Sequence, residues 1–197
     1  ANMPAYIVDL YSPGVFMNCK QLETVTFASW EMNCECIGVQ YFYGCSKLKE
    51  LTIPAGVGYP VYGLENFVGC TSLEKFTQYI MDWNWLDCYE NDFAGCVNLK
   101  SFELLWVDEF AYDEDENVIG YAEVSPAYVL SSGGSIWADT LVKQVRIGCD
   151  RNGKAYLYGP CFRDSAIEVA VIYAGGYIEV CTNEYYGEPG MGVFSGA

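Results

Sequence analysis

A short pattern of phenylalanine, cysteine and leucine returns along this chain at nearly constant spacing. In its clearest copy it reads Phe42-Tyr-Gly-Cys45-Ser-Lys-Leu48-Lys-Glu-Leu51-Thr-Ile53. Successive copies place the cysteine at 19, 45, 70 and 96, which gives steps of 26, 25 and 26 residues. A period of this length is typical of a solenoid, in which each coil of chain packs only on its neighbours. The repeat therefore predicts a stack of four regular coils over residues 16–105.

Within each copy, the spacing gives every apolar residue a place in the coil. Leu51 and Ile53 alternate with polar residues, so they form a very short strand with one buried face. Leu48 closes the bend into that strand, and the phenylalanine and cysteine fill the turn above it. We expect the buried spine to contain Phe16, Cys19, Leu22, Phe42, Cys45, Leu48, Phe67, Cys70, Leu73, Phe93, Cys96, Leu99 and Phe162.

Two further segments look like divergent copies and together span residues 136–173. The first fits the pattern with Ile136 at the phenylalanine position and Asp139 at the cysteine position. The second begins at Phe162 and lacks one residue before Ile167. These segments predict two more coils at the carboxyl end of the stack.

The extra length between the fourth and fifth copies has a local explanation. Residues 106–135 contain two strand-like runs around Asp113-Glu-Asp-Glu-Asn117, which predicts a β-hairpin inserted between coils. The acidic run could instead begin a calcium loop, but Val118 and Val124 stand where such a loop needs glycine and glutamate. We therefore expect a solvated acidic turn.

The two ends of the chain lack the repeat. Residues 1–15 and 174–197 are expected to cap the exposed ends of the stack, within one domain that covers residues 1–197. A chain of this length that is 52% hydrophobic and 18% charged can bury a core of its own.

The charge balance narrows the classes of partner. The chain has 10 Lys and Arg, 26 Asp and Glu and no His, a formal net charge of −16. Such a surface repels phosphate backbones and anionic membranes, so nucleic acid is not an expected partner. No apolar run approaches the roughly 18 residues of a transmembrane segment.

The sequence gives little support for a catalytic function. Without histidine there is no Ser-His or Cys-His nucleophile, and the commonest general base is missing. Carboxylate pairs are possible, but nothing in the sequence singles out two that would meet in a pocket. The glycine-rich stretches 133–135 and 190–192 lack the following Lys-Ser/Thr of a phosphate loop. We predict no catalytic residues and no cofactor.

The cysteines are expected to be structural thiols. Equivalent cysteines on neighbouring coils lie close together, but their side chains run parallel, which suits a disulfide poorly. A buried thiol that acts as a small apolar group is the better interpretation. Cys34-Glu-Cys36 could bind a soft metal, but no second cysteine pair or histidine completes the set, so no metal site is predicted.

The outward residues of successive strands should form one continuous face. Solenoids use such faces for extended binding, although β-branched residues also occur there simply because they suit a pleated surface. We take this face as the default site for a protein ligand. Its candidate residues are Thr24, Thr26, Glu50, Thr52, Lys75, Thr77, Ser101, Glu103, Gln144 and Arg146, continued by Val169 and Val171.

The third copy is irregular. Its second inward place holds Gln78, which predicts a strand that is distorted or shifted toward Tyr79-Ile80. The connection that follows contains Trp83 and Trp85, which would share one face of an extended segment, with Tyr89 nearby. These aromatic side chains could form a glycan-binding platform, or one indole could fill the core that Gln78 leaves open.

The motif of phenylalanine, glycine, cysteine and spaced leucines, clearest from Phe42 to Pro54, resembles the BspA-like (Treponema-type) leucine-rich repeat family. The resemblance covers residues 16–105 well and 136–173 loosely. It implies a right-handed solenoid, α/β by the convention for leucine-rich repeats but β-dominated in practice, with short parallel strands and little helix. It supplies no catalytic residues.

Members of this family are commonly bacterial surface or secreted proteins, often implicated in adhesion. The resemblance therefore implies a non-catalytic interaction module, extracellular or at the cell surface, whose export signal is already removed. A carbohydrate-binding module and a structural spacer are the alternatives.

Overall fold

The computed structural model shows a stack of short strands. In the described part of the chain every regular element is a strand and none is a helix, which confirms the predicted β-dominated coil. Trp83 and Trp85 lie outside the described residues, and of Tyr89 only the backbone is described. The structure describes residues 2–3, 13–28, 31–34, 39–57, 65–81, 87–89, 92–127, 130–132, 136–149, 154–158, 162–173 and 177–181.

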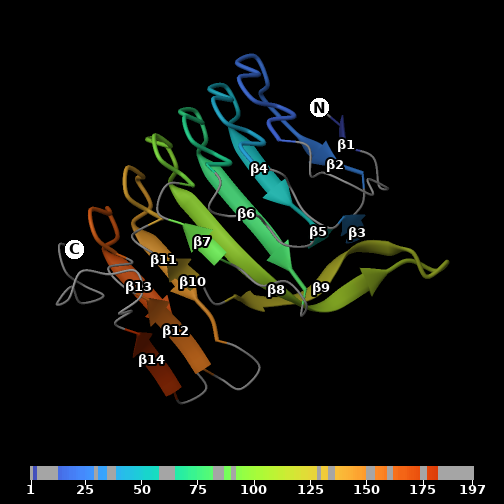
Figure 1. The fold of residues 1–197 in the computed structure, drawn as a ribbon. Helices are drawn as coiled ribbons and strands as arrows, with labels where there is room; N and C mark the ends of the chain where they lie inside the picture. Colours follow the sequence, from blue (N-terminus) through green and yellow to red (C-terminus); the bar gives the residue numbers. More distant parts are fainter. Residues whose placement is uncertain are drawn as a thin grey trace.

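Each coil contributes a first strand to one long row (Figure 1). These strands pair in parallel as β1–β2, β4–β6–β8 and β11–β13, and an isolated bridge joins Thr24, just before β2, to Glu50 on β4. The row consists of β1 (Asn2–Met3), β2 (Thr26–Phe27), β4 (Glu50–Ile53), β6 (Lys75–Ile80), β8 (Ser101–Tyr112), β11 (Gln144–Ile147) and β13 (Val169–Ile172).

A second row of parallel strands follows the first around each coil. Its pairs are β3–β5, β7–β10 and β12–β14. The leucine spacing predicted only one strand for each coil, so this second row is new information from the structure. Its strands are β3 (Glu31–Cys34), β5 (Ala55–Val57), β7 (Asp87–Tyr89), β10 (Leu130–Ser132), β12 (Lys154–Tyr158) and β14 (Tyr177–Cys181).

The phenylalanines of successive coils form a stacked column inside the turns. Phe16 and Phe42 stack at 5.5 Å, Phe42 and Phe67 at 5.9 Å, and Phe67 and Phe93 at 4.8 Å between ring centroids. The rings of each pair are within 17° of parallel. Phe76 packs against this column edge-on, 5.0 Å from Phe67 and from Phe93. Because every coil presents the same ring at the same height, the column extends with each repeat.

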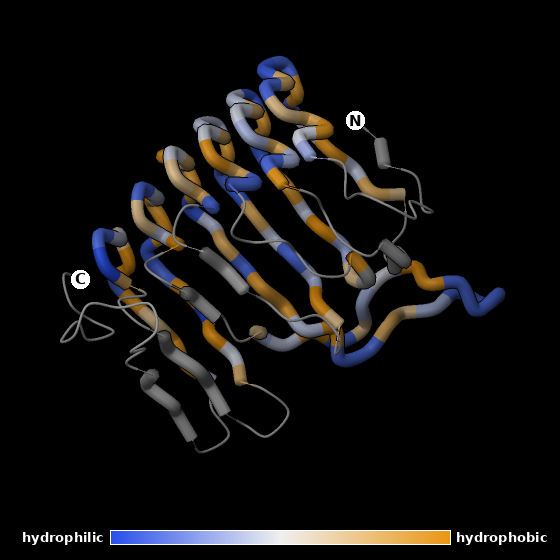
Figure 2. Tube along the Cα trace, in the orientation of Figure 1, coloured by the Kyte–Doolittle hydropathy of each residue, from blue (hydrophilic) through white to orange (hydrophobic). Residues whose placement is uncertain are grey.

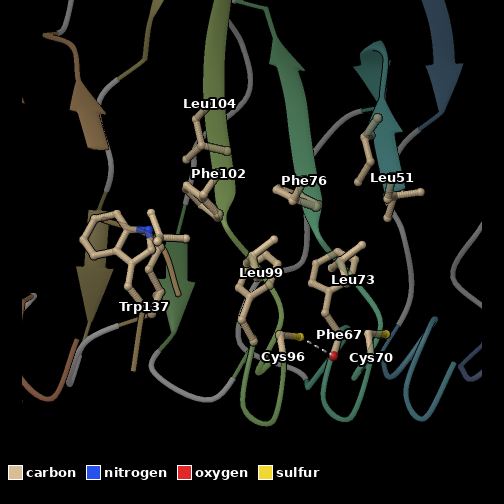
Figure 3. Close-up of a cluster of buried hydrophobic side chains, with 14 of the residues drawn as sticks. Leu51, Phe67, Cys70, Leu73, Phe76, Cys96, Leu99, Phe102, Leu104 and Trp137 are labelled. Carbon is tan, nitrogen blue, oxygen red and sulfur yellow. Dashed lines mark hydrogen bonds between the residues drawn. The ribbon is translucent and has the colours of Figure 1, made fainter. Parts of the chain in front are cut away.

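The cysteine thiols link neighbouring turns by hydrogen bonds. Cys45 Sγ donates to the carbonyl oxygen of Phe16 at 3.0 Å, and Cys96 Sγ donates to that of Phe67 at 3.1 Å (Figure 3). Cys70 Sγ bonds the carbonyl of Phe42 in the same way at 3.2 Å. Each thiol thus satisfies a backbone acceptor of the coil before it.

The backbone conformation of the turn explains why the motif contains glycine. Gly44, Gly69 and Gly95 have φ values of 71°, 73° and 75°, a left-handed conformation that side chains with a Cβ disfavour. The first copy has Asn18 at the equivalent place with φ 57°, and asparagine is among the few residues that tolerate this region. The turn geometry is therefore conserved between coils while the residue changes.

The fifth coil is in a different register from the one the sequence predicted. Trp137, not Ile136, occupies the phenylalanine place, because its ring stacks on Phe162 at 5.5 Å with a 13° interplanar angle. Asp139 has the positive φ of the glycine place at 63°, as does Asp164 in the sixth coil at 54°. The assignment of Asp139 to the cysteine position was wrong by one residue.

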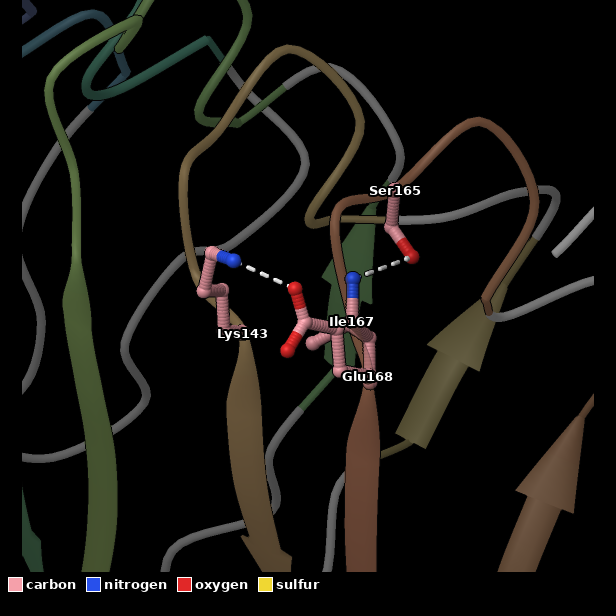
Figure 4. Close-up of polar contacts among 4 residues, drawn as sticks. All are labelled: Lys143, Ser165, Ile167 and Glu168. Atoms are coloured by element: carbon pink, nitrogen blue, oxygen red, sulfur yellow. Dashed lines mark hydrogen bonds and ion pairs between the residues drawn. The ribbon is translucent and has the colours of Figure 1, made fainter.

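Hydroxyl groups replace the cysteine in these two coils and allow a shorter turn. Thr140 Oγ1 donates to the carbonyl of Trp137 at 2.7 Å, and Ser165 Oγ donates to that of Phe162 at 2.8 Å. The amide of Ile167 then points at Ser165 Oγ, 3.4 Å away (Figure 4). In the cysteine coils the corresponding leucine amide bonds a carbonyl one residue further back. The side-chain oxygen thus substitutes for that carbonyl, which accounts for the missing residue.

The third coil is regular, contrary to the sequence prediction. Gln78 stays in register, opposite Ile53 on β4 and Leu104 on β8, and its side chain is fully buried. Six consecutive residues of β6 pair with β8 without a register shift, despite the polar side chain. The predicted shift toward Tyr79-Ile80 is therefore wrong.

The inserted segment and the ends also differ from the expected boundaries. β8 and β9 (Val118–Pro126) form an antiparallel hairpin, but β10 already belongs to the second row of the stack. The insertion thus ends near Ala127 rather than at residue 135. β1 and β14 pair in parallel with neighbouring coils, so these parts of the expected caps continue the stack.

A candidate protein-binding face

The pairing of the first row sets the predicted face residues in two lines across the strands. The register aligns Glu50, Lys75 and Ser101 in one line and Thr52, Thr77 and Glu103 in the next. The bridge to Glu50 adds Thr24 at one end. On β11 and β13, Gln144 lies opposite Val169 and Arg146 opposite Val171. The face residues that lie far apart in the sequence are therefore neighbours on one surface.

Most of these side chains are open to solvent. Ser101 and Glu103 are half-buried, and the exposed ones are Thr24, Thr26, Glu50, Thr52, Lys75, Gln144 and Arg146. Thr77 is the exception, because only 3% of it is exposed. It lies on the interior strand β6 between Thr52 and Glu103, and these neighbours leave little room above so short a side chain. The expectation that Thr77 offers a contact surface was wrong.

The first row is interrupted between β8 and β11. In the described residues these two strands are not paired with each other. Their coils are joined at the turn, where the amide of Leu141 donates to the carbonyl of Leu99 at 2.8 Å. Further along, Ala127 lies between the two strands: its carbonyl accepts the amide of Gly148, and its own amide donates to the carbonyl of Leu104. The chain returning from the hairpin thus separates two strands that would otherwise pair.

A hollow of about 480 Å³ lies over this interruption. Its lining includes Phe102 on β8, Gln144 on β11 and Tyr173 just beyond β13. An ion pair between Arg146 Nη2 and Glu103 Oε1 spans it from β11 to β8. Both partners are partly exposed, so the pair contributes little to stability and is accessible to a ligand.

A second hollow of about 420 Å³ lies at the other end of the face. Thr24 and Thr26 line it on the β2 side, and Glu50 and Thr52 on the β4 side. It exists because β2 and β4 are linked by one bridge only, so the strands are not held together along their length. The face is therefore uneven, with a recess at each end and the regular sheet of β4, β6 and β8 between them.

The turns and the spacing of the apolar spine identify the repeat. A family model described as "BspA type Leucine rich repeat region (6 copies)" matches residues 11–106. Residues 11–106 carry BspA-type leucine-rich repeats. The family resemblance read from the motif is thereby confirmed. No curated protein and no solved structure was found to match the chain.

Leucine-rich repeats generally mediate protein binding and are generally non-enzymatic, and BspA-type proteins are typically bacterial surface or secreted proteins. The described part of the chain contains no helix long and apolar enough to cross a membrane. The described residues also contain no group of three or more His, Cys, Asp or Glu side chains placed to hold a metal ion.

The cysteines of the BspA-type turns are free thiols in the structure. Burial raises the pKa of Cys45 to about 11 and that of Cys96 to about 12, and it raises the pKa of Cys70 as well. A thiol that holds its proton so tightly is a poor nucleophile, which agrees with a packing role.

Cys19 departs from the expected spine because it is exposed. It belongs to the first turn that the structure describes, and the described residues include no earlier turn to cover it or to offer it a phenylalanine carbonyl. Phe16 and Leu22 of the same turn are only half-buried, although they pack against the core. Cys19 therefore lacks the buried surroundings of Cys45, Cys70 and Cys96.

Some site residues could not be found from the repeat pattern. Phe102 and Tyr173 line the hollow between β8 and β11, and Tyr79 on β6 stands beside Glu103. Burial raises the pKa of Tyr79, and the nearby Glu103 carboxylate raises it further. The signal that was available is the extra length between copies four and five, which marks where the stack is interrupted.

In the acidic turn of the hairpin, the Asp113 carboxylate is hydrogen-bonded within the turn itself. Asp113 Oδ1 accepts the amides of Asp115 and Asn117, both at 2.9 Å. The backbone bond from Asn117 is the main reason that the pKa of Asp113 lies below its usual value. This is a turn that closes on itself, as expected for a solvated acidic loop.

Proposed function

We propose that this BspA-type repeat protein is a non-catalytic binding module, secreted or displayed on a bacterial cell surface, that recognises a protein through the face of its first strand row. The observation that carries the proposal is the alignment of polar side chains, all but Thr77 exposed or half-buried, in two lines across successive strands. An extended surface of this kind suits a protein partner better than a small molecule, because it offers many shallow contacts.

The two recesses support the same proposal. A flat sheet gives a partner few places to bury a side chain, whereas the hollows near Thr52 and near Arg146 can each receive one. The charges on the face are mixed: Glu50 and Lys75 are neighbours, and Arg146 pairs with Glu103. Mixed charges favour specificity over non-specific attraction to one sign of surface.

Site-specific photo-crosslinking tests the proposal. A photoreactive residue is placed at Thr52 on the face or at Lys47 on the exposed turn edge, and each folded variant is incubated with intact host cells or bacteria. The proposal predicts one defined protein adduct from Thr52 and none from Lys47. Equal labelling from both positions, or no protein adduct from Thr52, would refute it.

The captured protein then allows an affinity test. Arg146→Ala should weaken its binding about tenfold or more, as expected for a buried charged contact at a recess. The matched control is Lys20→Ala, which removes one exposed positive charge from the first turn.

The carbohydrate alternative remains a prediction from the sequence. It would be favoured if a glycan array gave a hit that Trp83→Ala abolished. A spacer would show neither kind of binding.

A further inference from the structure

The hairpin inserted after the fourth coil forms an arm of its own. Pairing of β8 with β6 ends at Trp106, and beyond that point β8 pairs only with β9 in the described residues. The arm, residues 107–125, therefore has two outer strand edges that pair with no other described strand. Figure 1 shows it projecting past the ends of β4 and β6, and Figure 2 shows that its tip is hydrophilic.

The arm is fixed to the stack at one point. The ring of Tyr121 on β9 lies 4.2 Å from that of Tyr79 on β6, and Tyr121 Oη accepts the amide of Ala55 at 2.8 Å. Phe110 packs on the other side of Tyr121 at 5.8 Å. A two-stranded ribbon is marginal by itself, so these contacts hold the arm in a defined position. In the described part of the chain, the outer edges of the ribbon are not paired with any other strand.

Apolar side chains on the arm remain open to solvent. Tyr112 is 56% exposed, Ile119 52% and Val124 41%. They lie on both strands of one short ribbon, whose outer edges pair with no other described strand. Long free edges with exposed apolar residues are normally avoided, because they pair with other chains.

The charge on the arm is of one sign. Residues 107–125 contain seven carboxylates, and the whole stretch 101–142 has no Lys or Arg. Glu109 lies directly opposite Glu123 in the ladder, and no ion pair is found for either in the described part of the chain. Like charges at directly opposite positions destabilise a sheet, so the arm carries an electrostatic cost that the fold itself does not relieve.

We propose that the β8–β9 arm is a second binding site, which takes an extended, lysine- or arginine-rich segment of another protein along a free edge of the ribbon. Edge pairing would supply backbone hydrogen bonds, apolar side chains of the segment would cover Ile119 and Val124, and its cations would neutralise Glu109 and Glu123. A second copy of this chain is a poor occupant, since each copy has a net charge of −16 and the same acidic arm. This site lies apart from the face proposed above and its test uses other residues.

The test uses the whole folded chain and a labelled peptide of about twelve residues in which lysine alternates with valine and threonine. Binding is followed by fluorescence anisotropy, with a peptide carrying glutamate in place of lysine as the negative probe. Glu109→Gln with Glu123→Gln should weaken binding of the lysine peptide about tenfold. The matched control, Glu23→Gln with Glu65→Gln, also removes two negative charges, from exposed positions outside the arm, and should change binding less than about twofold.

Hydrogen exchange locates the contact. Bound lysine peptide should slow exchange of amides in 108–112 or 118–124 and leave β4 and β6 unchanged. The proposal is overturned if the lysine peptide does not bind, if both double variants weaken binding equally, or if protection appears elsewhere. It is also overturned if the chain self-associates and Ile119→Lys restores a monomer, because a second copy would then occupy the arm. Replacing glutamate by glutamine removes a repulsion, so the test variant should remain folded.

Discussion

Replacing Gln78 by methionine should stabilise the protein. The Gln78 side chain is fully buried, and neither its Oε1 nor its Nε2 has a hydrogen-bond partner in the described part of the chain. Its neighbours in register are Ile53 and Leu104, which are both buried and apolar. A buried amide without partners costs free energy, because it has given up its bonds to water and gained none in return.

The expected gain follows from that cost. An unsatisfied buried polar group costs about 1–3 kcal/mol, and methionine is close to glutamine in length and volume, so little packing is lost. We therefore expect Gln78→Met to raise the free energy of unfolding by about 2 kcal/mol. For a chain of this size that corresponds to a Tm increase of about 4–8 °C.

Urea unfolding followed by far-UV circular dichroism measures the effect. The midpoint should rise while the slope of free energy against urea stays unchanged, since the area exposed on unfolding is the same. Gln144→Met on the exposed surface of β11 is the control and should change stability by less than about 0.5 kcal/mol. An unchanged or lower midpoint for Gln78→Met would show that the amide is hydrogen-bonded in solution and that the reasoning is wrong.

Two further predictions concern the spine. Phe67→Ala should cost about 3–5 kcal/mol because its ring is stacked on both sides, whereas Phe16→Ala in the half-buried first turn should cost less than about 2 kcal/mol. Urea midpoints compare them, and equal losses would contradict the stacked column. In the folded protein at pH 8, an alkylating reagent should modify Cys19 while Cys70 and Cys96 remain protected until urea unfolds the chain, as read by peptide mass spectrometry. Modification of Cys96 as fast as Cys19 would argue against the buried thiols.

Both the regular coils and their core could be predicted from the sequence alone. Phe42 meets Phe67, and Cys70 meets the carbonyl of Phe42, because equal residues at equal intervals fall at the same height on neighbouring coils. Such contacts depend only on the period and on the next coil along the chain. The local rule fails where the turn chemistry changes, as at Trp137 and Thr140, because a hydroxyl that replaces a backbone acceptor removes one residue from the turn.

Only the tertiary structure decided the features on which the proposed sites depend. The hollow between β8 and β11 arises because the returning hairpin places Ala127 between two strands, and no spacing in the sequence encodes that position. The arm is held by a bond from Ala55 to Tyr121, 66 residues further along the chain. A repeat specifies contacts between neighbours in the stack, whereas an insertion can reach across several coils to a position that only the folded chain defines.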